Sequence, residues 1–466
     1  MKKTSLLLFT TMILLGGCQI NGSSPIDSSN TSISEEIKDY RDEVRNVDAV
    51  VTDELKGCFD FFYETAVTEE NSSAYGLIPD RYNVKMNKMG AYASIASVGF
   101  GLASLPTGVE NEWITKEEGY NRTLLTLKNL ALLEKINGFY FHFMDMSKGL
   151  RYNKCEVSLI DTAILICGAL TAGRYFGGEC ETLATEIYSK VNWKWYYNDA
   201  IMRFYMGYKP ESGFEGEWNH CAEQLMVYVL AAGAPNKDYR VGSEAYKVML
   251  SNTKKCSSMP SYNSYYMSWH GSIFTYQFSH AFIDFRYIVD YKGINWYENS
   301  INASKAAVEY AESKKGLYKT YSRDSWGMTA CDGPNGYSGE YGSAPNAYGK
   351  VAKLDGTVPP CGAIGSIPFV PEDAIRAMKH YKTYDKMWSK YGFVDAYNLG
   401  TTSSHTDDSI NGKIPDGGWF CDQVIGIDKG ISALMIENYM SGMIWNIFMD
   451  IEYVQNGLDA LGFKKA

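Results

Sequence analysis

The sequence lacks the short motifs that mark several large enzyme classes. It contains no G-x-S-x-G, no H-E-x-x-H, no phosphate-binding P-loop and no dinucleotide-binding G-x-G-x-x-G pattern. These absences argue against an α/β-type serine hydrolase, a zinc peptidase, a P-loop NTPase and a nicotinamide- or flavin-dependent enzyme. A function for this chain therefore has to be sought in other arrangements of polar side chains.

Closely spaced metal ligands are missing as well. The ten cysteines are scattered without a C-x-x-C pair, and the six histidines are irregularly spaced. Structural zinc sites use closely spaced pairs of these residues, so we expect neither a metal nor a cofactor. The sequence leaves open whether Cys155, Cys180 or Cys256 form disulfides.

Positive charge is scarce relative to negative charge. The 44 Lys and Arg residues are outnumbered by 54 Asp and Glu residues, which gives a formal net charge of −10. A chain of this charge repels the phosphate backbone of nucleic acids and other anionic polymers. We therefore expect neither nucleic acid nor an anionic polymer as a partner.

The first 18 residues have the pattern of a lipoprotein signal peptide. Lys2 and Lys3 precede an apolar run over residues 5–15, which is shorter than the roughly 20 residues that span a bilayer. The run ends in Leu-Gly-Gly-Cys18, the lipobox pattern in which the cysteine thiol is acylated and the chain is cut before it. An ordinary signal peptide with an incidental cysteine is the alternative. We predict a lipid anchor at Cys18 and a location outside the cytoplasm, at the cell envelope.

A polar segment separates this signal from the rest of the chain. Residues 19–47 are rich in Ser, Asn, Asp and Glu and poor in apolar side chains. Such a composition cannot bury enough apolar surface to fold, so we predict a flexible tether. Residues 48–466 then form one catalytic domain, which we expect to be monomeric.

Apolar residues in this domain recur with the spacing of α-helices, including those of residues 274–289. Segments that are apolar on every side alternate with segments that are amphipathic. Because a helix that is apolar all round must be enclosed by other helices, the alternation predicts an all-α (α/α)6 toroid of inner and outer helices. The apolar segments are residues 93–105, 159–172, 224–232 and 430–449, and the amphipathic ones are residues 115–135, 180–191, 297–314 and 371–391.

Residues 316–365 interrupt this pattern. The segment is rich in Gly, Pro, Tyr, Ser and Asp, and turn-forming residues at that density exclude a long helix. Its aromatic side chains argue against disorder. We predict a long rim loop over one mouth of the toroid.

Acidic residues in apolar helical surroundings are the candidate catalytic groups, because burial raises the pKa of a carboxyl group. Hydrolysis of a glycosidic bond needs two carboxyl groups, one of them protonated. Glu156 and Asp161 lie just before and just inside an apolar helical segment. Each also has a structural interpretation, because Ser158 can cap that helix and acids in a first turn offset the helix dipole.

Glu223 and Asp428 occupy comparable positions. Asn219 can cap a helix whose first turn holds Glu223, so a purely structural role is again the alternative. Trp218 lies nearby, and an indole face stacks on the apolar face of a pyranose ring. Asp428 lies between apolar runs, where it must be paired, hydrogen-bonded or functional. In a purely structural role its partner would be Lys429 or a loop arginine.

At these segments the sequence resembles the bacterial glycoamylase-like proteins, a family that includes the endo-β-1,2-glucanases. The matching runs follow one another in order over roughly residues 51–449. They are GFYFHFMD (138–145), EVSLIDTA (156–163), WNHCAEQ (218–224), WHGS (269–272), SWGMTACDGP (325–334), GAIGS (362–366), YGFVDA (391–396), IDKG (427–430) and IENY (436–439).

This resemblance implies a single (α/α)6 toroid, an exported or lipoprotein setting, and hydrolysis of a glucan, β-1,2-linked, with inversion. Carried over by position, Glu223 resembles the general acid. Glu156, Asp161 and Asp428 resemble the other acids of the pocket, one of which serves the nucleophilic water. The residues that resemble substrate-binding positions are Trp218, His270, Trp326 and Asp332.

Three other functions stay open on the sequence. A glucoamylase-type hydrolase of another glucan would use the same toroid. A non-catalytic, glycan-binding surface lipoprotein would explain the anchor and the aromatic residues, but it needs no acids in apolar settings. A polysaccharide lyase would suit the fold, but the net charge disfavours its uronate substrates.

Overall fold

Buried and half-buried helices alternate along the chain. The computed structural model describes residues 39–349 and 352–466, and Cys18 lies outside them. The helices that are buried on nearly every side are α2 (Ile95–Glu110), α4 (Leu159–Phe176), α7 (Leu225–Gly233), α10 (Pro360–Ile364) and α12 (Gly426–Met440). The helices that expose one face are α1 (Ala49–Thr65), α3 (Lys116–Leu132), α5 (Gly178–Ser189), α8 (Glu244–Asn252), α9 (Trp296–Lys314) and α11 (Pro371–Tyr381).

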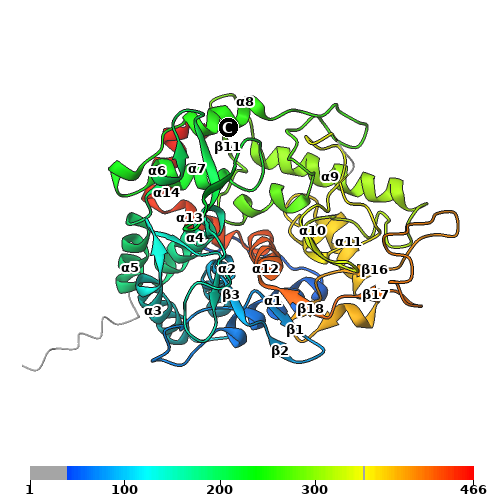
Figure 1. Cartoon of the computed structure of the whole chain (residues 1–466), viewed down its shortest axis with the longest axis horizontal. Helices are drawn as coiled ribbons and strands as arrows, with labels where there is room; N and C mark the ends of the chain where they lie inside the picture. Colours follow the sequence, from blue (N-terminus) through cyan, green and yellow to red (C-terminus); the bar gives the residue numbers. More distant parts are fainter. Residues whose placement is uncertain (1–38, 350–351) are drawn as a thin grey trace, which may run out of the picture. The chain divides into compact units, whose positions relative to one another are not determined.

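These helices form a closed ring (Figure 1). Within the described ranges, outer and inner elements follow one another in the order α1–α2, α3–α4, α5–α7, α8 with two 3-10 turns, α9–α10 and α11–α12. Helix α2 packs against α4 and against α12, and α12 also contacts α1 and α10, which closes the ring. The arrangement confirms the predicted (α/α)6 toroid.

Side-chain caps fix where several helices begin. The hydroxyl oxygens of Ser94 and Ser158 accept hydrogen bonds from the first turns of α2 and α4, and the Asn295 side chain does the same for α9. Thr115 and Glu118 form a reciprocal capping box at the start of α3. These bonds satisfy N–H groups that have no partner inside the helix.

Residues 274–289 do not form the expected α-helix. They contain two 3-10 turns, η2 (Ile273–Tyr276) and η3 (Phe278–Ala281), followed by irregular chain and β11 (Ile288–Val289). Their aromatic and β-branched residues are weak helix formers. In addition, Gln277 Nε2 donates to Gly362 O at 2.7 Å, so this side chain bonds to a neighbouring element. The helix spacing was misleading because tertiary contacts determine the conformation here.

Two other predicted helices are shorter than expected. The segment 371–391 leaves the helix at Tyr381 and continues into the ladder of β14 (Trp388–Ser389) and β15 (Gly392–Phe393). The segment 430–449 is divided into α12 and α13 (Met443–Met449) by Gly442, whose φ of 69° only glycine adopts easily.

Short β-ladders, which the all-α prediction omitted, lead into the inner helices. Strand β3 (Tyr92–Ser94) pairs with β6 (Phe143–Asp145) and precedes α2. Strand β7 (Val157–Ser158) pairs with β9 (Arg203–Lys209) and precedes α4, and β18 (Gln423–Ile425) pairs with β1 (Arg81–Asn83) and precedes α12. The ladders hold the N-terminal ends of these helices at one mouth of the ring.

The predicted rim segment, residues 316–365, is largely irregular. It contains a hairpin of β12 (Cys331–Gly333) and β13 (Gly336–Ser338) and ends in the short helix α10. The remaining elements are β2 (Lys88–Met89), β4 (Lys135–Ile136), β5 (Phe139–Tyr140), α6 (Trp193–Tyr196), β8 (Tyr197–Asn198), β10 (Gly213–Glu217), η1 (Lys237–Tyr239), η4 (Asp385–Met387), β16 (Tyr397–Asn398), β17 (Trp419–Phe420), α14 (Glu452–Leu461) and β19 (Lys464–Lys465).

The last residues of the predicted tether, 39–47, lie against the domain. The Asp42 N–H donates to Ser441 O at 2.9 Å and the Arg45 N–H donates to Met440 O at 3.0 Å. Tyr40 is only 8% exposed. The tether prediction is therefore too long at this end, because a few apolar and charged side chains in this polar segment find partners at the C-terminal end of α12.

Helix α4 is long and apolar enough to cross a membrane, but 89% of its apolar window is buried inside the domain. It is therefore a core helix. The nine cysteines in the described part of the chain are free thiols, and all but Cys256 are buried. Cys155, Cys180 and Cys256 thus form no disulfide there.

Candidate active site

The four predicted catalytic acids meet at the N-terminal ends of the inner helices. Asp161 lies in the first turn of α4 and Asp428 in the first turn of α12. Glu156 immediately precedes β7, and Glu223 lies in the turn before α7. Because the β-ladders hold these helix ends at one mouth, residues that are far apart in the sequence lie at the same end of the ring. Glu223 lines one cavity there and Asp428 lines another.

Glu223 lies in a cavity of about 360 Å³. Burial, and then the charge of Asp161, raise the pKa of Glu223 to about 7. The residue is partly exposed and lines the cavity wall. A carboxyl group with this pKa is protonated in a large fraction of molecules at neutral pH, which suits a general acid.

The local geometry around Glu223 differs from the expected helix cap. Helix α7 begins at Leu225, so Glu223 precedes the helix. The Asn219 side chain instead bonds to His220 Nδ1 at 2.6 Å. Ser279 Oγ donates to the backbone oxygen of Glu223 at 2.5 Å, and this bond fixes the turn that directs the carboxyl group into the cavity.

His142 connects the other two acids on this side of the mouth. Its Nδ1 lies 2.7 Å from Glu156 Oε1, and its Nε2 lies 3.7 Å from Asp161 Oδ1. Burial lowers the pKa of His142, but the charges of Asp161 and Glu156 more than offset this and raise it to about 9. The hydrogen bond from His142 lowers the pKa of Glu156 to about 2. Both groups are therefore charged at neutral pH.

Asp161 has a structural role in capping α4 and also lies beside the other candidate catalytic groups. The Asp161 N–H donates to Ser158 Oγ at 3.2 Å, which confirms Ser158 as the helix cap, and Ser158 Oγ donates to Asp161 Oδ2 at 2.5 Å. The other carboxylate oxygen faces His142. Capping therefore orients the Asp161 carboxylate toward the pocket.

Asp428 does not pair with Lys429. Cys361 Sγ donates to Asp428 Oδ1 at 3.3 Å, whereas Lys429 Nζ donates to Glu54 Oε1 on α1 at 2.8 Å. The structural alternative for Asp428 was therefore wrong. Burial raises the pKa of Asp428 to about 6.

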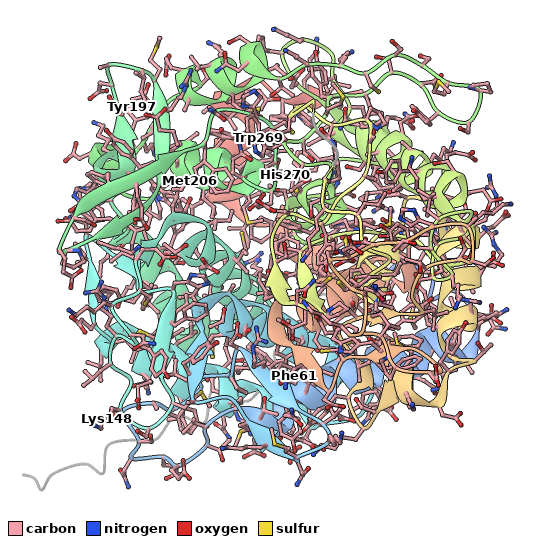
Figure 2. All side chains as sticks on the ribbon, turned by 45° about the vertical axis from the view of Figure 1, so that its right-hand side comes forward. Phe61, Lys148, Tyr197, Met206, Trp269 and His270 are labelled. Atoms are coloured by element: carbon pink, nitrogen blue, oxygen red, sulfur yellow. The ribbon has the colours of Figure 1, made fainter. Side chains whose placement is uncertain are left out.

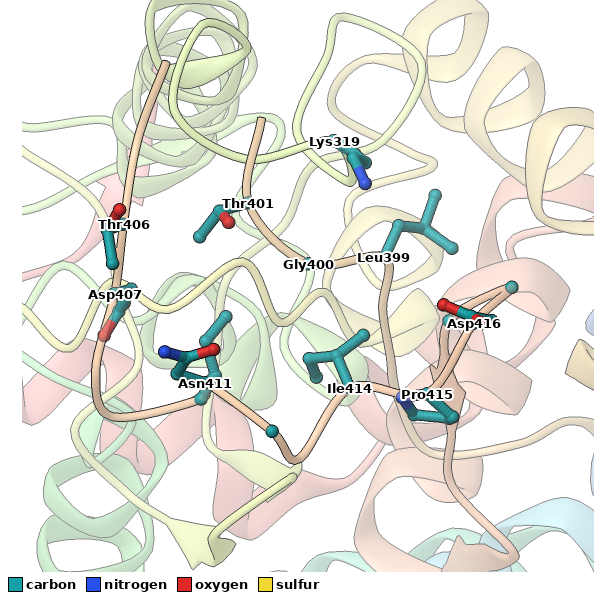
Figure 3. Close-up of a pocket in the computed structure, with 14 residues that line it drawn as sticks. Lys319, Leu399, Gly400, Thr401, Thr406, Asp407, Asn411, Ile414, Pro415 and Asp416 are labelled. Atoms are coloured by element: carbon teal, nitrogen blue, oxygen red, sulfur yellow. The ribbon is translucent and has the colours of Figure 1, made fainter. Parts of the chain in front are cut away.

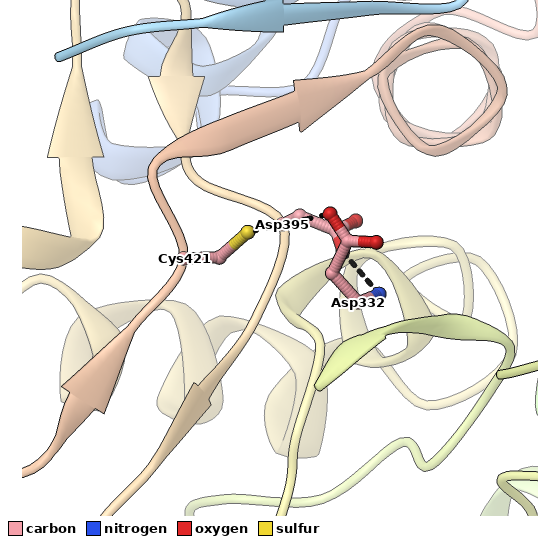
Figure 4. A group of neighbouring side chains, drawn as sticks. All are labelled: Asp332, Asp395 and Cys421. Atoms are coloured by element: carbon pink, nitrogen blue, oxygen red, sulfur yellow. Dashed lines mark hydrogen bonds between the residues drawn. The ribbon is translucent and has the colours of Figure 1, made fainter. Parts of the chain in front are cut away.

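Asp332 belongs to a network beside Asp428. Its carboxylate accepts a hydrogen bond from Arg81, at 3.1 Å, and Arg81 also donates to Asp80 at 3.0 Å. The backbone N–H of Asp332 donates to Asp395 Oδ2 at 2.7 Å (Figure 4). The Asp332 carboxylate is thus held by protein groups, and only 8% of the residue is exposed.

The sequence analysis did not predict three residues of this network as site residues: Asp80, Arg81 and Asp395. Asp395 occurs in the run YGFVDA, and Asp80 and Arg81 follow an apolar run. Each is an acid or base next to buried residues, which is a usable signal. The long-range pairing that gives these residues their place is visible only in the fold.

Three side chains of this network are of types that can bind a metal ion. Ligand atoms of Asp332, Asp395 and Cys421 lie within 4.8 Å of one another. Cys421 Sγ donates to Asp332 Oδ2 at 3.6 Å, and Asp395 Oδ2 accepts the Asp332 N–H. The three residues are therefore already linked by hydrogen bonds of their own.

Aromatic rings line the cavity around Glu223. Trp218 and His270, which were predicted to bind substrate, both contribute to its wall. Trp269, which was not predicted, is 39% exposed, and its ring lies 4.8 Å from that of Tyr348. Met206, Trp269 and His270 lie close to one another in Figure 2, on the same wall. This surface can stack on the apolar face of a sugar.

Trp326 does not face the cavity. It is 0% exposed, and its backbone oxygen accepts a hydrogen bond from the hydroxyl of Tyr381 on α11 at 2.9 Å. Its indole Nε1 donates to Asp373 O at 3.4 Å. Its prediction as a substrate-binding residue was wrong, because the side chain packs between the rim segment and α11.

A second hollow, of about 440 Å³, lies in the loop after β16 (Figure 3). Its lining is mainly polar and contains Thr401, Asn411 and Asp416, without an aromatic ring among the described residues. Asp407 in its wall accepts a hydrogen bond from Tyr318 at 2.6 Å. This hollow therefore lacks the stacking surface found beside Glu223.

Comparison with known proteins agrees with this geometry. An exo beta-1,2-glucooligosaccharide sophorohydrolase (non-reducing end) from Parabacteroides distasonis is 26% identical over 402 residues, covering 78% of this chain and 52% of that protein. The chain thus spans about half the length of this curated relative. The endo-beta-1,2-glucanase structure from Chitinophaga pinensis has a TM-score of 0.76 at 24% identity, covering 90% of this chain and 99% of that one. A beta-1,2-glucanase structure from Parabacteroides distasonis has a TM-score of 0.74 at 23% identity, covering 88% of this chain and 59% of that one.

The structural matches show the fold, and the family follows from the sequence match. The family model Glycoamylase, described as "Putative glucoamylase", matches residues 215–452. That range is more than half of the 466 residues and includes Glu223, Asp395 and Asp428. The chain belongs to the glycoamylase family.

Proposed function

We propose that this protein is a glycoside hydrolase that cleaves β-1,2-linked glucan by an inverting acid–base mechanism. The proposal rests mainly on Glu223, whose carboxyl group lines a cavity with an aromatic wall and has a pKa raised to about 7. A protonated acid and a stacking surface are the two features that cleavage of a neutral sugar chain needs. The relatives named as β-1,2-glucan hydrolases support this substrate.

The roles of the residues follow from their protonation. Glu223 donates its proton to the oxygen of the leaving sugar as the glycosidic bond breaks. A carboxylate across the pocket accepts a proton from the attacking water, and Asp161 and Asp428 are the candidates for this role. Glu156 is less suited, because its bond to His142 lowers the pKa to about 2 and makes it a weak base. Inversion follows when water attacks from the face opposite the leaving oxygen.

Product analysis tests the substrate and the reaction together. The purified protein would be incubated separately with linear β-1,2-glucan, laminarin and starch, and the products resolved by size. We expect short oligosaccharides or sophorose from β-1,2-glucan alone, with the α-anomer formed first. Products from starch alone would indicate a glucoamylase-type enzyme, and binding without cleavage would indicate a capture protein. A uronate polymer incubated in parallel tests for a lyase, which would release an unsaturated product absorbing in the ultraviolet.

We propose in addition that Cys18 is acylated, that the protein is held at the cell envelope outside the cytoplasm, and that it acts as a monomer. The lipobox pattern supports the anchor. Expression in bacteria fed a labelled fatty acid would incorporate label into the wild type and not into Cys18→Ser. Light scattering of the soluble Cys18→Ser protein would give the mass of one chain.

A further inference from the structure

Two buried carboxyl groups lie next to each other beneath the mouth of the toroid. Asp395 follows β15 and is 4% exposed, and Asp428 on α12 is 8% exposed. Both line a cavity of about 10 Å³, which has room for about one water molecule. Two like charges so poorly solvated require a compensating group.

One buried oxygen of each group has no hydrogen-bond partner among the residues that the structure describes: Asp395 Oδ1 and Asp428 Oδ2. The other oxygens are occupied, because Asp395 Oδ2 accepts the Asp332 N–H at 2.7 Å and Asp428 Oδ1 accepts from Cys361 Sγ at 3.3 Å. The two side chains line the same small cavity and interact with each other. Two carboxyl groups can form a hydrogen bond only when one of them carries a proton.

The nearby cations are already used by other acids. Arg81 pairs with Asp80 and Asp332, and Lys429 pairs with Glu54. The remaining titratable groups that influence the pair are neutral at pH 7, because the ordinary pKa is about 10 for tyrosine and about 8.5 for cysteine. They are Tyr337 and the buried thiols of Cys331, Cys361 and Cys421, and burial raises the pKa of these thiols further. A proton is therefore the compensating charge that the described surroundings provide.

We propose that Asp395 carries this proton and donates its Oδ1–H to Asp428 Oδ2, acting as the positioning residue for the Asp428 carboxylate. In this arrangement Asp395 Oδ2 is the carbonyl oxygen that accepts the Asp332 N–H, and Asp428 accepts two hydrogen bonds, from Asp395 and Cys361. Burial and the neighbouring charge of Asp428 raise the pKa of Asp395 well above its usual range, consistent with this assignment.

The consequence concerns the reaction in the proposed function, on which this part of the inference rests. Two donors hold the Asp428 carboxylate in one orientation and favour its ionised form. Asp428 can then remain a carboxylate although it is buried. Asp395 itself takes no proton from the substrate or the water.

Substitution of Asp395 by asparagine and by alanine tests the assignment. Asparagine keeps an acceptor for the Asp332 N–H and a donor for Asp428, so Asp395→Asn should retain activity within about 10-fold of the wild type. Asp395→Ala removes the donor and should lose about 100-fold or more, with the acidic limb of the kcat/KM profile shifted. Asp428→Asn serves as the reference for loss of the carboxylate. Circular dichroism would show that each variant is folded.

A folded Asp395→Asn protein as inactive as Asp428→Asn would overturn the proposal, because it would show that Asp395 acts as a carboxylate. Infrared difference spectra of wild type and Asp395→Asn without substrate provide a test independent of activity. We expect the wild type to show a protonated carboxyl stretch at pH 7 that Asp395→Asn lacks. Absence of that band, or a stoichiometric cation found by metal analysis, would equally refute the proposal. A wild type that cleaves no glucan would refute the proposed function and leave the infrared result valid.

Discussion

His142 Nδ1 lies 2.7 Å from Glu156 Oε1, and this pair links two successive segments of the active-site mouth. The imidazole also stacks on Phe143, with 3.8 Å between ring centroids. His142 is therefore held by an aromatic ring on one side and by carboxylates at both nitrogens. Its charge state should be measurable as a contribution to stability.

The first prediction concerns this contribution. The folded-state pKa of His142, about 9, is above the usual value of about 6.5. Its stabilising effect is thus fully present below pH 6.5 and is lost as the pH rises through 9. The difference in unfolding free energy between wild type and His142→Gln should shrink by about 2–3 kcal/mol between pH 6 and pH 9.5. His220→Gln is the control, because burial lowers the pKa of His220 and the corresponding difference should not shrink as the pH rises. A difference that stays constant across this range would contradict the prediction.

The second prediction concerns the general acid. Glu223→Gln cannot donate a proton, so kcat should fall by about 10³-fold or more, which is within the range for general acid catalysis. The melting temperature should stay close to that of the wild type. Glu217 lines the same cavity, is exposed and pairs with Arg203, so Glu217→Gln should retain activity within about twofold. Full activity of Glu223→Gln would end the assignment.

The third prediction uses the pH dependence of kcat/KM to distinguish Asp428 from Glu156 as the base. Glu223 must be protonated, so activity should fall as the pH rises through about 7. A base must be ionised, so activity should fall as the pH drops through about 6 if Asp428 is the base. If Glu156 were the base, the acidic limb would lie near 2. Initial rates measured well below KM from pH 3 to pH 9 would distinguish these cases.

The fourth prediction concerns the buried ion pair of Lys429 and Glu54, whose side chains are 5% and 1% exposed. Lys429→Met leaves the Glu54 charge without its partner and should lower the unfolding free energy by about 3–5 kcal/mol. The double variant Glu54→Gln with Lys429→Met should recover part of this loss. Lys128→Met breaks an exposed pair with Glu179 and should change stability by less than about 1 kcal/mol. Urea unfolding gives the unfolding free energy of all three variants. Equal losses in Lys429→Met and Lys128→Met would show that burial does not increase the contribution of the Lys429–Glu54 pair to stability.

The fifth prediction separates two tryptophans. Trp269→Ala should raise KM about 10-fold, equivalent to about 1.4 kcal/mol, because an exposed stacking surface is lost. Its melting temperature should hardly change. Trp326→Ala removes a fully buried ring and should cost about 3–5 kcal/mol of stability. If Trp326→Ala were stable and altered only KM, the buried position of this side chain would be wrong.

The sequence predicted best what depends on short distances along the chain. Ser158 caps α4 and Asp161 follows three residues later, so a local rule was enough for both. The apolar pattern of the inner helices was equally local, and it led to the correct toroid. Residues 274–289 show the limit, because their side chains bind neighbouring elements and override the helix spacing.

Long-range pairing explains most of what was missed in the site. Lys429 follows Asp428 directly, yet its partner Glu54 is 375 residues away in the sequence. Asp395 meets Asp428 only after β15 and α12 come together. Trp269 and Trp326 are both tryptophans within runs of the family pattern, and only the packing of the rim decides which one is exposed.

The segment 39–47 has a consequence for access to the active-site mouth. It joins the domain at the C-terminal end of α12, whereas Asp428 lies near the N-terminal end of this 15-residue helix, about 18 Å away. The incoming chain therefore reaches the ring on the side opposite the mouth. A long polymer could enter the mouth without steric hindrance from residues 39–47.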